Sequence, residues 1–132
     1  MPTFDDVEQI TTGLPDVTVG QRHGNRTWFV ADKAFAWERP FTKADIKRFG
    51  DEPIRDGEVL AVSVADLGEK EAVLAECRRG VFTMQHFDGY PAVLIQLRVV
   101  GKRVLRDLVV DAWLAHAPDA VADAYVARVR RR

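Results

Sequence analysis

RTWFVADKAFAWER, residues 26–39, is the stretch that decides the class of fold. Aromatic and β-branched residues, which favour strands, fill both halves of it. Ala31-Asp32-Lys33 interrupts them with a short polar segment that is typical of a tight turn. The pattern predicts two neighbouring antiparallel strands, over 26–31 and 33–39.

Side chains alternate between the two faces of a strand, so the same stretch also predicts which residues share a face. Trp28 and Val30 are expected on one side of the sheet and Phe29 on the other. Phe35 and Trp37 are expected to share one face of the second strand.

Outward from this hairpin, hydrophobic periodicity and turn residues predict the remaining elements. We expect strands over 17–22, 59–64, 81–87 and 92–100, an exposed connection over 51–57, and helices over 4–12, 43–49, 68–79, 102–117 and from 118 onward. Hairpins dominate this order. It therefore predicts an α+β fold, a single domain over residues 1–132 in which helices pack on one face of an antiparallel sheet.

Composition narrows the class of protein. The chain has 132 residues, of which 47% are hydrophobic and 30% charged, as in ordinary globular domains. Cys77 is its single cysteine, so it forms no internal disulfide, and its place on the apolar side of a predicted helix favours burial. The first residues lack the pattern of a signal peptide, and the apolar runs are too short to span a membrane. We expect a cytoplasmic protein with no membrane partner.

Chemical motifs are sparse. The three histidines, His23, His86 and His116, are too scattered for a local metal site, and the glycines do not form a phosphate-binding loop. His86 stands two residues before Asp88, a spacing that suits a hydrogen bond shaping a hairpin better than acid–base catalysis. We expect a non-enzymatic domain without metal or cofactor.

Basic residues are interleaved with the aromatic hairpin and continue into the short helix that follows it. The candidate nucleic-acid contacts are Arg22, Arg26, Lys33, Arg39, Lys43, Lys47 and Arg48. Arginine beside aromatic rings can hold phosphates while the rings stack on bases. Alternatively, the aromatic side chains form the core face of the sheet and the charges its solvated face. With a net charge of −1, any DNA binding is expected to be weak, salt-sensitive and sequence-tolerant.

A second hypothesis is a module that binds a small molecule or a protein partner. Its pocket would lie between the sheet and the C-terminal helices, lined by Trp37, His86, Tyr90 and Trp113. A hydrolase or isomerase is a third possibility.

Three segments of the chain resemble the MmcQ/YjbR family. They are GNRTWFVADKAFA at 24–36, DLGEKEA at 66–72 leading to HFDGYPAVL at 86–94, and DAW at 111–113 leading to AP at 117–118. The chain departs from the usual family pattern at CRRG, residues 77–80, and at Met84-Gln85. The resemblance implies an α+β fold like the frataxin-like sandwich or the double-wing arrangement of DNA-binding proteins, and it implies DNA as the partner.

Overall fold

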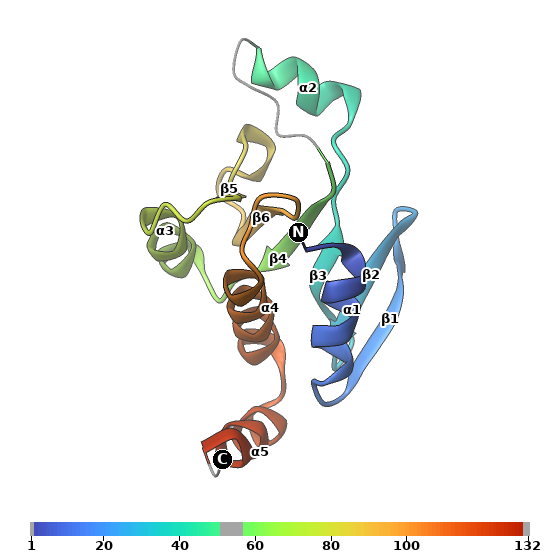
Figure 1. Ribbon diagram of the computed structural model, residues 1–132, viewed down its shortest axis with the longest axis vertical. Helices are drawn as coiled ribbons and strands as arrows, with labels where there is room; N and C mark the ends of the chain where they lie inside the picture. Colours follow the sequence, from blue (N-terminus) through green and yellow to red (C-terminus); the bar gives the residue numbers. More distant parts are fainter. Residues whose placement is uncertain (1, 51–56, 131–132) are drawn as a thin grey trace.

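A computed structural model describes residues 2–50 and 57–130 of the chain (Figure 1). Within them the strands are β1 (Val17–Arg22), β2 (Asn25–Val30), β3 (Lys33–Glu38), β4 (Val59–Ser63), β5 (Val81–Phe82) and β6 (Ala92–Gln96). The helices are α1 (Phe4–Thr12), α2 (Lys43–Phe49), α3 (Leu67–Ala75), α4 (Lys102–His116) and α5 (Asp119–Arg130), with a 3₁₀ turn, η1 (Gln85–Phe87). The connection expected over 51–57 lies outside the described residues except for Gly57.

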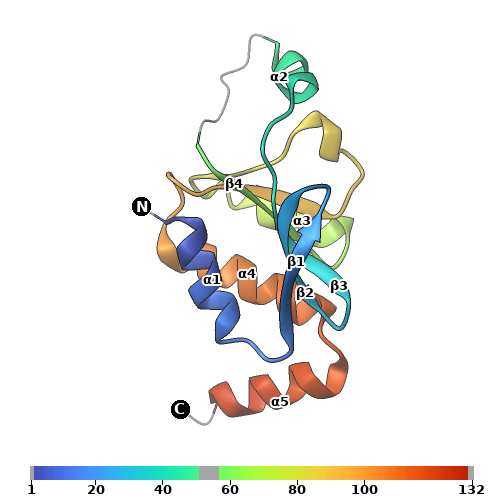
Figure 2. The same ribbon diagram turned by 90° about the vertical axis from the view of Figure 1, so that its right-hand side faces the viewer.

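The six strands form one sheet in the order β1-β2-β3-β4-β6-β5, and every neighbouring pair is antiparallel. Helices α1 and α4 lie together on one side of β1–β3 (Figure 2). Helix α2 stands beyond one end of the sheet and α5 beyond the other (Figure 1). The predicted α+β fold with an antiparallel sheet is confirmed.

The main core lies between the sheet and helices α1 and α4. Val7 of α1, Leu105 and Val109 of α4, and Trp28 and Leu60 of the sheet are all fully buried in it. On α4, the buried residues Leu105, Leu108, Val109, Ala112 and Trp113 form one apolar stripe, in which residues three and four apart share a helical face.

A β-bulge in β3 changes the predicted faces of the hairpin. Trp28 pairs with Ala36 and Phe29 with Ala34, so Phe35 is the extra residue on its strand. Phe35 and Ala36 both lie in the main core under the helices, whereas Trp37 packs against a second apolar cluster on the opposite face of the sheet. The expectation that Phe35 and Trp37 share a face is wrong, because the bulge interrupts the alternation.

A second apolar cluster covers part of the sheet face that is turned away from α1 and α4. Phe82, Met84 and Phe87 lie over Ala61 and Leu94, and Trp37 and Phe41 pack against the cluster's edge. The strand expected over 81–87 ends at Phe82, since the chain then turns through η1 back over the sheet.

Helix α3 is shorter than predicted, and this exposes Cys77. The helix ends at Ala75, and Cys77 follows in a left-handed conformation with φ of 51°. Its thiol is exposed, so the expectation of a buried cysteine is wrong. The sequence pattern failed here because α3 buries only Val73 and Lys70, one turn of helix, and not an extended apolar stripe.

Helix α5 has no buried residue. Val121 and Tyr125 pack against the main core as predicted, but Val129 is exposed. None of the described helices is long and apolar enough to cross a membrane.

Trp113 is the residue on α4 whose truncation we expect to cost most. It is fully buried, its Nε1 donates a hydrogen bond of 3.0 Å to the Pro15 carbonyl, and its ring meets Tyr125 edge-on at 5.1 Å. Trp113→Ala should lower the free energy of unfolding by about 3–5 kcal/mol. Trp113→Phe keeps an aromatic ring and loses the hydrogen bond, which should cost about 1 kcal/mol. A further loss is expected because the phenyl ring fills less of the core than the indole. Urea denaturation measures both, and a loss under about 1 kcal/mol for Trp113→Ala would contradict this packing.

Candidate nucleic-acid interface

A groove of about 950 Å³ lies on the sheet face opposite α1 and α4. The hairpin strands β1–β3 supply most of it, and the segment from η1 to β6 supplies one wall. We call it the sheet groove, and it is lined by Arg22, His23, Asn25, Thr27, Asp32, Lys33, Ala34, Trp37, Arg39, Pro40, Thr42, His86, Phe87 and Tyr90.

Strand register places Arg22, Asn25, Thr27 and Trp37 on one face, whereas Lys33, which pairs with Val30 of the main core, reaches the sheet groove from the end of the hairpin. Arg22 pairs with Asn25 and Thr27 pairs with Trp37, and paired residues of antiparallel strands point to the same side. The connection between β1 and β2 is a two-residue turn in which His23 and Gly24 both have positive φ. Such turns match the twist of the strands and hold a tight hairpin, and glycine tolerates this conformation without strain.

Three aromatic rings lie together in the sheet groove. Tyr90 lies 6.4 Å from Trp37, with an angle of 54° between the ring planes. Phe87 meets Tyr90 edge-on, with a centroid distance of 5.6 Å. Tyr90 is nevertheless 47% exposed, which is high for an aromatic residue at the border of an apolar cluster.

A buried lysine holds the wall that carries Tyr90. Lys70 of α3 is only 6% exposed, and its Nζ donates hydrogen bonds to the carbonyls of Phe87, at 2.6 Å, and Tyr90, at 2.8 Å. Burial lowers the pKa of Lys70, and the carboxylate of Asp88 partly opposes that shift. Sequence analysis missed this residue. The sequence feature that indicates burial of Lys70 is its position on the apolar side of the predicted helix, three residues before Val73.

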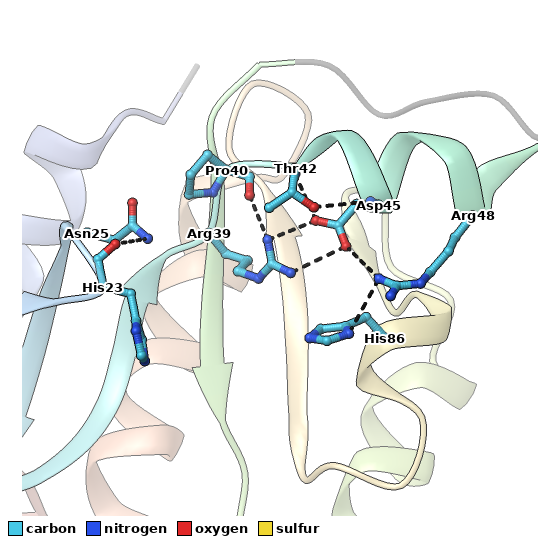
Figure 3. Close-up of polar contacts among 8 residues, drawn as sticks. All are labelled: His23, Asn25, Arg39, Pro40, Thr42, Asp45, Arg48 and His86. Atoms are coloured by element: carbon cyan, nitrogen blue, oxygen red, sulfur yellow. Dashed lines mark hydrogen bonds and ion pairs between the residues drawn. The ribbon is translucent and has the colours of Figure 1, made fainter.

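A buried carboxylate orients the arginines where α2 meets the sheet groove (Figure 3). Asp45 of α2 is 2% exposed and accepts hydrogen bonds from Arg39, at 2.9 Å, and from the Thr42 backbone, at 2.9 Å. Arg39 also donates to the Pro40 carbonyl at 2.6 Å. Arg48 lies 3.5 Å from both Asp45 and His86 Nδ1, so it joins α2 to η1.

These contacts determine the charge of Asp45. Burial raises its pKa, but the hydrogen bond from the Thr42 backbone and the interaction with Arg39 outweigh it, leaving the pKa below the usual 3.8. Asp45 therefore stays ionised and orients two guanidinium groups at the same time.

Six of the seven predicted basic residues form two groups, and the seventh, Arg26, lies apart from both. Arg22, Lys33 and Arg39 line the sheet groove. Lys43, Lys47 and Arg48 are exposed on α2, just beyond the groove residues Pro40 and Thr42. Among the described residues, Arg22, Lys33, Lys43 and Lys47 form no ion pair, whereas Arg39 and Arg48 share Asp45.

The structure does not bring Arg26 to the sheet groove. Its guanidinium pairs with Glu8 at 3.3 Å and Glu38 at 2.9 Å, and it lies over the rings of Phe4 and Trp28. Arg26 thus joins α1 to the sheet on the face that the helices cover, since it is one strand position away from both Asn25 and Thr27.

The pocket predicted between the sheet and the C-terminal helices is not assembled as expected. Trp37, His86 and Tyr90 do come together, in the sheet groove. Trp113 belongs to the buried stripe of α4 and lies in the main core on the other side of the sheet. The bulge at Phe35 turns Trp37 away from the helices, so the two tryptophans are on opposite faces.

The hollow on the helix side has the opposite charge character. It measures about 640 Å³ between α3, α4 and α5, and its walls hold the acids Glu69, Glu76, Asp107 and Asp111 and the bases Arg78, Arg106 and Arg130. Burial and the neighbouring carboxylates of Asp107 and Glu69 raise the pKa of Asp111. Four acids against three bases disfavour phosphate there, whereas the lining of the sheet groove has three bases against one acid, Asp32, and one of these bases, Arg39, is paired with Asp45.

The chain has curated relatives in mycobacteria. It is 42% identical over 130 residues to the Uncharacterized protein Rv2570 of Mycobacterium tuberculosis (strain ATCC 25618 / H37Rv), covering 96% of this chain and 98% of the relative. The Uncharacterized protein MT2646 of M. tuberculosis (strain CDC 1551 / Oshkosh) and the Uncharacterized protein Mb2600 of M. bovis (strain ATCC BAA-935 / AF2122/97) match to the same extent. The chain therefore belongs to the same bacterial family as these proteins. No protein family model matches it. No solved structure matches it either.

Asp45 predicts a specific dependence of stability on pH. Because its pKa is lower in the folded than in the unfolded chain, its contribution is present above pH 3.8 and is lost as pH falls below that value. Asp45→Asn keeps an oxygen for the Thr42 N–H and removes the charge. At pH 7 this variant should lose about 3 kcal/mol, the lower end of the cost of breaking a buried pair, since Arg39 retains some exposure.

The difference between wild type and Asp45→Asn should shrink when denaturation is repeated at pH 3. Asp123→Asn, which changes an exposed carboxylate on α5, is the matched control and should have little effect at either pH. A difference for Asp45→Asn that is equal at both pH values would show that Asp45 acts through its shape and not through its charge.

Proposed function

We propose that the protein is a non-enzymatic, cytoplasmic DNA-binding domain of the MmcQ/YjbR type, which binds DNA weakly and with little sequence preference. The observation that carries the proposal is the composition of the sheet groove. Arg22, Lys33 and Arg39 converge on one concave surface together with the aromatic rings of Trp37 and Tyr90. Cations of this kind bind phosphate, and the resemblance of the segments 24–36, 66–72, 86–94, 111–113 and 117–118 to that family supports the same partner.

Weak, sequence-tolerant binding follows from the number and the place of the charges. Three groove cations allow about three phosphate contacts, and the chain as a whole carries a net charge of −1. Reading base edges requires a helix or ribbon that enters a DNA groove with suitable side chains. Here the cations lie in a concave surface. The longest described helix, α4, packs its apolar residues Leu105, Val109 and Trp113 into the core.

Binding of a small molecule in the sheet groove is the second candidate. Its volume of about 950 Å³ and its aromatic wall are in the range of ligand sites, and the groups that would orient a ligand, Arg39 and His86, are held by hydrogen bonds. An anionic, planar compound would suit the same residues.

The salt dependence of DNA binding tests the proposal. With about three phosphate contacts, affinity should fall about 40-fold between 50 and 200 mM salt. The double variant Arg22→Ala/Lys33→Ala should bind more weakly to every DNA sequence and retain only about a fourfold salt effect, since one contact remains. Fluorescence anisotropy with labelled DNA of two unrelated sequences measures both effects.

The matched control is Lys102→Ala/Arg103→Ala, which removes the same two charges from exposed positions on α4, on the other face of the sheet. It should bind like the wild type. Equal weakening by both double variants would mean that only net charge matters, and absence of any complex at 50 mM salt would contradict DNA binding.

A further inference from the structure

We infer that the sheet groove selects single-stranded DNA, with a base stacked against Trp37 and Tyr90 and the adjoining phosphates held by the groove cations. This inference rests on the proposed function and specifies its ligand. It follows from the positions of the rings relative to the charges.

The rings remain available to a planar ligand. Trp37 and Tyr90 are tilted by 54°, and Phe87 meets Tyr90 at 76°, so neither of these contacts is a parallel stack. A parallel stack would cover the ring face that a base needs. Tyr90 keeps nearly half of its surface exposed although its backbone is held by Lys70, so its ring is presented on a fixed support.

Cations lie on both sides of Trp37 along β3. Lys33 begins the strand, and Arg39 directly follows its last residue, Glu38. Arg22, across the sheet at the end of β1, lies toward the Arg39 end, because it pairs with Asn25 next to the Thr27–Trp37 pair. A nucleic-acid strand that places a base over Trp37 therefore meets Arg22 and Arg39 toward one end of β3 and Lys33, at the border of the groove, toward the other.

A duplex cannot use this arrangement. Both faces of each internal base pair are covered by its neighbours, so stacking on a protein ring requires an unpaired or extruded base. A duplex would offer the groove only its backbone, and the contribution of the aromatic rings would be lost. Stacking on one aromatic side chain typically changes affinity about 5- to 150-fold.

Trp37 also supplies its own signal. The other two tryptophans, Trp28 and Trp113, are fully buried in the main core, on the opposite side of the sheet from the groove. Quenching of tryptophan fluorescence by DNA would therefore report on Trp37.

The experiment compares a single-stranded dT12 oligonucleotide with the dT12·dA12 duplex at 50 mM salt, by fluorescence quenching and by anisotropy. We expect dT12 to quench the fluorescence and to bind at least fivefold more tightly than the duplex. Trp37→Leu should weaken dT12 binding about 5- to 150-fold and leave duplex binding unchanged. Trp37→Phe, the matched control, keeps a ring and should retain most of the affinity.

Tyr90→Leu provides a second test, because this exposed side chain can be replaced without emptying the core. It should weaken dT12 binding even if Trp37→Leu disturbs the fold, which circular dichroism would reveal. Tighter binding of rU12 than of dT12 would overturn DNA as the ligand.

Two other results would separate this inference from the proposed function. Salt-dependent binding that is equal for dT12 and duplex, and insensitive to both aromatic variants, would overturn the inference and leave DNA binding intact. Absence of binding to either oligonucleotide would overturn both.

Discussion

The structure depends on the burial of β4 and β6 on both of their faces. All five residues of each strand are buried, so apolar side chains must cover the sheet from two sides. Helices α1 and α4 cover one side, and Phe82, Met84 and Phe87 cover the other. This second cover extends only as far as Trp37 and Phe41. The hairpin strands β1–β3 are left open on that face, and this is where the sheet groove forms.

Two buried charges hold the walls of the groove in place. Asp45 ties Arg39 and Arg48 to the start of α2, and Lys70 ties the carbonyls of Phe87 and Tyr90 to α3. A buried charge is tolerated only when it is well hydrogen-bonded, so each site fixes its neighbours in one arrangement. The groups that would meet a ligand are therefore positioned before it arrives, which lowers the entropic cost of binding.

Local patterns predicted much of the fold. The aromatic hairpin, the capped helix after Thr42 and the apolar stripe around Trp113 all follow from short-range periodicity. The bulge at Phe35 could not be predicted, because Phe35 and Ala36 are both compatible with either face until pairing with β2 is known. The early end of α3, which exposes Cys77, depends in the same way on how little of that helix the core can cover.

The candidate site shows the same limit. The sequence indicated basic residues beside aromatic ones, and Arg22, Lys33 and Arg39 do converge. It could not show that Arg26 pairs with Glu8 and Glu38, which lie 18 and 12 residues away along the chain, or that Trp113 faces the other side of the sheet. The most direct measurement is a ¹⁵N–¹H correlation spectrum recorded with and without a short single-stranded oligonucleotide at low salt. Our account predicts shifts of the Trp37 indole N–H and of the amides of residues 22–25, 33–39 and 86–90. Shifts confined to α4 and α5, or an unchanged spectrum, would contradict it.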